Sequence, residues 1–130
     1  MSFDENKHIA YDGQEFCIEW YVDVKGQSPA LDFVNDMPES HIGKLMHLFE
    51  VMGDIGKIHD ITKFRHEGDK IYAFKLQPFR FLSFFTVGKK IIITNGFRKD
   101  KDKLDPGEKD LSVKARTDYL KRVKEGEYYE

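Results

Sequence analysis

A length of 130 residues suits a single domain, and we expect one over residues 1–130, with flexible ends at 1–12 and 124–130. Apolar residues make up 40% of the chain, which excludes a disordered protein, and no apolar run approaches the roughly 20 residues that span a bilayer. The single cysteine excludes an internal disulfide, and the start lacks an apolar signal core. These features predict a cytoplasmic protein with no membrane partner.

The net charge of −2 hides a segregation of charge along the chain. Residues 1–56 carry 3 Lys or Arg and 11 Asp or Glu, whereas residues 57–103 carry 12 and 5. Residues 104–130 are nearly balanced, with 6 and 7. The middle third is therefore the candidate anion-binding face. The alternative is a solvated surface whose acidic and basic parts attract each other.

In chain order, the first predicted element is a strand over residues 15–24, which are aromatic and β-branched. Cys17 lies in this strand, where a small buried residue is expected rather than a nucleophile. Residues 28–56 follow as a helical hairpin divided by Pro38, because apolar residues recur from Ile42 onward at helical spacing.

Residues 57–69 show little periodicity and are expected to connect the hairpin to a meander of three strands. These strands are predicted over residues 70–77, 79–87 and 89–95. Three isoleucines run without alternation in the last of them, so this strand should be central and covered on both faces. A final helix opens at Asp105-Pro106.

The order of strand, helical hairpin, meander and helix predicts an α+β fold. Its sheet should be mostly antiparallel, with the N-terminal helical hairpin packed on one face and a C-terminal helix. The first strand is expected at an edge or beside the last strand.

Positive side chains gather around the meander. If its first turn is centred on Gln77-Pro78, Lys75 and Arg80 face each other, an unfavourable pairing unless an anion lies between them. Other cations flank the meander: Lys63, Arg65 and His66 precede it, and Arg98, Lys99 and Lys101 follow it. The preceding group is expected at the far end of the sheet from the turn. We therefore predict a groove along the sheet, the alternative being side chains that face water with no ligand.

No metal-binding, P-loop or GxSxG motif occurs in the sequence. Phosphate chemistry would then depend on cationic clamps and general acid–base groups, with no cofactor. Proton transfer is a candidate role for His66 and Lys63. Stabilising the charge on a phosphate is a candidate role for Lys75, Arg80 and Arg98.

Two segments, FKLQPFRFLSFF at 74–85 and IIITNGFRKDKDKLDPGE at 91–108, are followed by the predicted last helix. Their order and spacing resemble the RelE/ParE toxin superfamily, and within it the phage-derived, HigB-like branch. Lys75 stands where that family usually has its first Arg, and Arg80 matches its second. Lys99 matches a residue of the family's basic turn.

The resemblance implies a RelE-like fold and the toxin component of a type II toxin–antitoxin system. It implies a ribosome-associated endoribonuclease (mRNA interferase) in which a ribose 2′-hydroxyl attacks the adjacent phosphate without a metal. Combined with the charge pattern, this predicts Arg80, Lys75, His66 and Lys63 as catalytic residues and Arg65, Arg98, Lys99 and Lys101 as RNA-binding residues. A helix-turn-helix antitoxin, the ribosome and mRNA are the expected partners. The alternatives are a ParE-like protein that inhibits a topoisomerase by binding, or a phage or mobile-element accessory protein.

Overall fold

The computed structural model describes residues 8–99 and 105–129, and in this part of the chain it contains six strands and three helices. The strands are β1 (Ile9–Asp12), β2 (Cys17–Trp20), β3 (Phe64–His66), β4 (Tyr72–Leu76), β5 (Phe79–Thr86) and β6 (Lys90–Arg98). The helices are α1 (Pro29–Asn35), α2 (Glu39–Ile55) and α3 (Pro106–Lys124). The predicted α+β class, helical hairpin, meander and last helix are all confirmed.

The strands form one sheet in the order β1-β2-β6-β5-β4-β3. Neighbouring strands are antiparallel except β2 and β6, which run parallel. Strand β2 thus lies beside the last strand, as one of the two predicted arrangements requires. Ile91, Ile92 and Ile93 of β6 are fully buried, which confirms that this strand is central.

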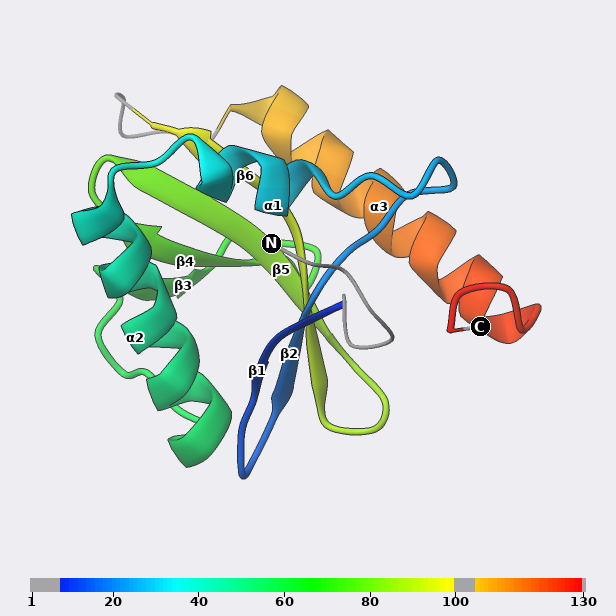
Figure 1. Cartoon of the computed structure of the whole chain (residues 1–130), viewed down its shortest axis with the longest axis horizontal. Helices are drawn as coiled ribbons and strands as arrows, with labels where there is room; N and C mark the ends of the chain where they lie inside the picture. The colour runs from blue at the N-terminus through cyan, green and yellow to red at the C-terminus, as the bar shows by residue number, and fades with distance from the viewer. Residues whose placement is uncertain (1–7, 100–104, 130) are drawn as a thin grey trace.

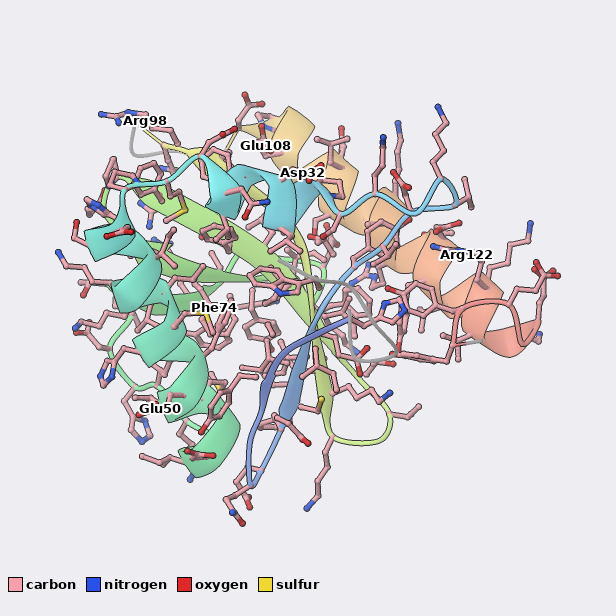
Figure 2. All side chains as sticks on the ribbon, in the orientation of Figure 1. Asp32, Glu50, Phe74, Arg98, Glu108 and Arg122 are labelled. Atoms are coloured by element: carbon pink, nitrogen blue, oxygen red, sulfur yellow. The ribbon has the colours of Figure 1, made fainter. Side chains whose placement is uncertain are left out.

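Helices cover both faces of the sheet (Figure 1). Helices α1 and α2 pack on one face, where Phe49 of α2 contacts Trp20 and Phe74. Figure 2 shows Phe74 between α2 and the sheet. Helix α3 packs on the other face, where the ring of Tyr119 meets that of Phe84. The two faces are called the α2 face and the α3 face below.

The helices begin and end at the capping residues that the sequence indicates. Ser28 caps α1, because its side chain accepts a hydrogen bond from the backbone N–H of Leu31 at 3.3 Å. Asp105 caps α3 in the same way, by accepting from the N–H of Gly107 at 2.8 Å. Helix α2 ends at Gly56, whose φ of 84° lies in the left-handed region that glycine adopts without strain.

Two edge strands are not anticipated by the sequence. Residues 9–12 form β1, which extends the sheet beyond β2, and residues 64–66 form β3, where only a connecting segment was expected. The β1–β2 turn docks on the end of α2, where the backbone N–H groups of Glu15 and Phe16 donate to Gly53 O at 2.7 and 2.9 Å. Edge strands this short carry little sequence signal of their own, so tertiary contacts decide their existence.

The segment after α3 is tied to β2 and the residues that follow it. Tyr128 is 5% exposed, and its hydroxyl accepts a hydrogen bond from the N–H of Val22 at 2.9 Å. The hydroxyl of Tyr129 donates to Oε1 of Glu19 at 2.6 Å, and Lys90 forms an ion pair with the same carboxylate at 3.0 Å. One cation of the basic middle third is thereby matched by an acidic residue of the first third.

Candidate functional site

The central pair of the site is Lys75 and Arg80, which are direct partners across β4 and β5. This register confirms that the turn between them is centred on Gln77-Pro78. Because side chains alternate along a strand, Lys75 shares the α3 face with Ala73, and Arg80 shares it with Leu82. Two cations of like charge therefore face each other on one surface of the sheet.

Strand β3 brings further cations to the same place. It runs antiparallel to β4, so that Arg65 pairs with Ala73, and Lys63 O accepts a hydrogen bond from Lys75 N at 2.8 Å. Lys63 therefore lies level with Lys75. The expectation that this segment lies at the far end of the sheet is wrong for Lys63, because the sequence signal did not include a strand that folds back along β4.

Lys99, directly after β6, is a further cation near Lys75 and Arg80. Its backbone N–H donates to Pro78 O at 2.7 Å, beside the β4–β5 turn, and its side chain is only 9% exposed. Its charge and those of Arg65 and Arg80 are close enough to lower the pKa of Lys75. We call Arg65, Lys75, Arg80 and Lys99 the cationic cluster.

Arg80 is the most unusual member of the cationic cluster. Its side chain is 7% exposed, and its Nε and Nη1 have no hydrogen-bond partner among the described residues. Burial lowers the pKa of its guanidinium below the ordinary value, an effect that Glu67 opposes and Arg65 reinforces. A buried, incompletely hydrogen-bonded cation destabilises a fold unless a ligand satisfies it.

Lys75, beside Arg80, is half-buried. Burial is the largest cause of its lowered pKa, followed by the positive charges of Arg80 and Arg65, whereas Glu67 raises it. Its Nζ donates to Ile61 O at 3.1 Å, which joins the side chain to the segment before β3. Burial and like charge both favour the neutral amine, a state from which Lys can accept a proton.

Besides Lys63, which lies next to the cationic cluster, three predicted site residues are not placed in it. His66 pairs with Tyr72 on the α2 face, where its ring lies 4.9 Å from that of Tyr72 and its Nε2 accepts from Lys70 N at 3.2 Å. Arg98 pairs with Phe79, also on the α2 face, and Figure 2 shows it at the rim of the molecule. Lys101 lies outside the described residues.

Helix α3 fixes the turn that precedes β4. Lys109 forms an ion pair with Asp69 at 2.9 Å, and Nη1 of Arg116 donates to Asp69 O at 2.6 Å. Gly68, Asp69 and Lys70 all have positive φ, so this turn needs such anchors. This turn comes directly after Glu67, whose negative charge raises the pKa of both Lys75 and Arg80 against the effect of burial. The sequence pattern did not indicate Glu67 as a site residue.

A pocket of about 710 Å³ lies between the first half of α2 and the edge of β4. Its polar wall contains Lys44, His47 and Lys63, and its apolar wall contains Leu48 and Leu76. Lys75 also lines it, so this side chain borders both the pocket and the cationic cluster. The sequence pattern did not indicate that β4 and α2 would form opposite walls of a pocket.

Cys17 lies on β2, away from the cationic cluster. Burial, and then the charges of Glu19 and Asp12, raise the pKa of its thiol to about 11. Cys17 is half-buried and not fully buried as expected. Its raised pKa agrees with the expectation that it is not a nucleophile, because the thiolate is the reactive form and is scarce near neutral pH.

We therefore expect Cys17 to react slowly with iodoacetamide. At pH 7.5 its rate should be roughly 100-fold or more below that of an ordinary thiol, and it should rise about tenfold per pH unit between pH 8 and 10. Mass spectrometry of the folded protein measures this rate, and the urea-unfolded protein is the control. Equal rates for the folded and unfolded protein would contradict the raised pKa.

Two further features are absent from residues 8–99 and 105–129. Within these ranges no three His, Cys, Asp or Glu side chains come together as a metal site. None of the helices described is both long and apolar enough to cross a bilayer.

The six-stranded, mostly antiparallel sheet, with two helices on one face and a C-terminal helix on the other, is consistent with a RelE-like fold. Residues 32–117 match the model of the family described as phage-derived protein Gp49-like (DUF891). The chain belongs to this family, which is part of the clan of RelE/HigB-like toxins. No curated protein matches the chain.

Proposed function

We propose that this protein is a toxin of a type II toxin–antitoxin system that cleaves mRNA on the ribosome. Membership of a phage-derived, toxin-like family supports the general class. The observation that carries the proposal is Arg80, a buried guanidinium with two nitrogens unpartnered among the described residues, directly opposite Lys75. A phosphate between Arg80 and Lys75 would neutralise both charges, and its oxygens would accept hydrogen bonds from the unpartnered N–H groups of Arg80.

The proposed reaction is an attack by a ribose 2′-hydroxyl on the adjacent phosphate. A bond forms between the 2′-oxygen and phosphorus, and the bond from phosphorus to the 5′-oxygen breaks. The products are a 2′,3′-cyclic phosphate and a 5′-hydroxyl, so one proton leaves the 2′-oxygen and one reaches the 5′-oxygen. RNA supplies the nucleophile, and the protein needs to supply only charge stabilisation and proton transfer.

Each residue of the cationic cluster has a proposed role. Arg80 binds two oxygens of the scissile phosphate, because its fork-shaped guanidinium suits bidentate contacts. Arg65 and Lys99 bind neighbouring phosphates. Lys75, whose pKa is lowered, and Lys63 beside it are the candidates for proton transfer. His66 is a weaker candidate than the sequence indicated, because it pairs on the opposite face of the sheet.

The direct test maps cleavage products in cells and in a translation reaction. Induced expression of the wild type should arrest growth and produce mRNA fragments with 5′-hydroxyl ends, whereas Arg80→Ala should produce neither. A message with a 2′-O-methyl group at a mapped site should resist cleavage there. Growth arrest without such fragments would instead support the alternative of a binding-only, ParE-like inhibitor.

Binding of single-stranded RNA should depend steeply on salt. If three to four phosphates contact the cationic cluster, the slope of log K against log salt should be about −2 to −3. The affinity should then fall about 20- to 50-fold between 50 and 200 mM salt. Fluorescence anisotropy with a labelled 2′-O-methyl RNA measures the slope, and an affinity that stays constant over this range would exclude the phosphate contacts.

The proposed partner is a helix-turn-helix antitoxin. A toxin of this class is stored as a complex, so co-expression with the product of the neighbouring gene should restore growth. Co-purification of the two chains and loss of the 5′-hydroxyl fragments are the measurements that check it.

A further inference from the structure

The reaction proposed above uses only Lys63 and Lys75 from the lining of the pocket between α2 and β4, and the rest of this pocket has no role in it. Its lining includes Lys44, His47, Lys63 and Lys75 and contains no carboxylate among the described residues. Asp60 lies beside the pocket, because its carboxylate accepts a hydrogen bond from Oγ1 of Thr62 at 2.6 Å and is close enough to Lys63 for that charge to lower the pKa of Asp60. The charge of this pocket therefore suits an anion.

The shape and lining of the pocket suit a nucleotide rather than a free phosphate. Its volume of about 710 Å³ is several times larger than a single phosphate needs, and Leu48 and Leu76 provide an apolar wall. His47 is exposed on α2 and presents an imidazole ring to the same space. A base can stack on an aromatic ring or lie on apolar side chains while cations hold its phosphate.

Gly43 is a second, independent observation. It lies inside α2 and lines the pocket, although glycine is the poorest helix former after proline. A Cβ at this position would meet nothing within 4 Å among the described residues, so packing within the protein does not explain the glycine. A glycine leaves room for a ligand to approach the helix backbone closely.

Lys75 connects this pocket to the cationic cluster. It lines the pocket and is the direct partner of Arg80, the proposed phosphate clamp. A strand of RNA whose scissile phosphate lies between Lys75 and Arg80 could therefore continue over the edge of β4 into the pocket. Beside Lys75 no full strand lies between β4 and the pocket, because β3 begins at Phe64 and on this side Lys75 bonds to Lys63, in the segment before β3.

We propose that the pocket between α2 and β4 binds a nucleotide next to the scissile phosphate and sets the sequence preference of cleavage. This inference rests on the proposed function and adds a second RNA subsite to the one at Lys75 and Arg80. Lys44 contacts the phosphate of this nucleotide, and His47 and the two leucines contact its base.

The test uses two variants that fill the pocket without disturbing the core. Gly43→Gln adds bulk, and Gly43→Glu adds the same bulk with a negative charge, and both residues form helices better than glycine does. Binding of a labelled single-stranded 2′-O-methyl RNA should weaken about fivefold in Gly43→Gln and about tenfold or more in Gly43→Glu. Thermal unfolding of each variant checks that the fold is retained.

Two further substitutions separate the roles of the lining residues. Lys44→Gln should reduce the salt slope by about 0.7, because one phosphate contact is lost, whereas Lys57→Gln, the same change in charge outside the pocket, should leave it unchanged. His47→Ala should weaken binding about fivefold at an unchanged salt slope and relax the base preference at mapped cleavage sites.

The outcomes distinguish the subsite from the proposed function. If Arg80→Ala weakens RNA binding while Gly43→Glu stays within twofold of the wild type, the subsite is excluded and the proposed function stands. If Gly43→Glu weakens binding and Arg80→Ala does not, the pocket stands as an RNA site and the clamp is excluded. A wild type that binds no RNA at low salt overturns both.

Discussion

An Arg80→Met variant should retain or gain thermal stability while RNA cleavage falls about 100- to 1000-fold. Methionine keeps much of the side-chain volume and removes a buried charge whose Nε and Nη1 have no partner among the described residues. Replacing a poorly satisfied buried charge by an apolar side chain is often neutral or stabilising. Loss of a donor that stabilises developing charge costs about two to three orders of magnitude in rate.

The measurements are thermal unfolding and the rate at which 5′-hydroxyl ends appear. Arg80→Lys should recover only part of the rate, because an ammonium lacks the bidentate geometry of a guanidinium. Arg65→Met is the matched control, since Arg65 belongs to the same cationic cluster but is exposed, and it should lose less activity. A large fall in the melting temperature of Arg80→Met would show that Arg80 supports the fold and is not held there for a ligand.

Two glycines of α2 should respond in opposite directions to replacement by alanine. Gly43→Ala should stabilise the protein by about 0.5–1 kcal/mol, because a Cβ there meets nothing within 4 Å and alanine is the better helix former. Gly53→Ala should destabilise it by about 1–3 kcal/mol, because its Cβ would lie 2.6 Å from the ring of Tyr11. That ring cannot move freely, since its hydroxyl donates to Asp54 at 2.6 Å.

Urea unfolding of both variants measures the difference, and each serves as the control for the other. The destabilised variant should also lose protection from amide exchange in β1, because Glu15 and Phe16 bond to Gly53 O where the β1–β2 turn docks. Equal effects of the two substitutions would show that helix propensity, and not the contact with β1, decides stability at both positions.

Elements with local sequence signals could be predicted without the structure. The apolar spacing from Ile42 onward indicates α2, the residues Asp105-Pro106 start α3, and the run of isoleucines in β6 indicates a strand covered on both sides. The turn at Gln77-Pro78 sets the register that places Lys75 opposite Arg80. These features follow from neighbours in the chain, so a periodic pattern and a turn suffice to predict them.

The edges of the sheet and the final composition of the site depend on contacts between distant segments, which the sequence pattern did not indicate. Strand β1 forms because its turn docks on Gly53, and β3 forms because it pairs with β4, and both contacts join segments far apart or weakly patterned in sequence. In this pairing Lys63 lies beside Lys75, whereas His66 lies on the opposite face of the sheet. Side chains alternate between the two faces along a strand, so residues an odd number of positions apart point in opposite directions. The burial of Arg80 and the pocket beside α2 likewise depend on how the helices cover the sheet. A local sequence pattern does not predict that packing.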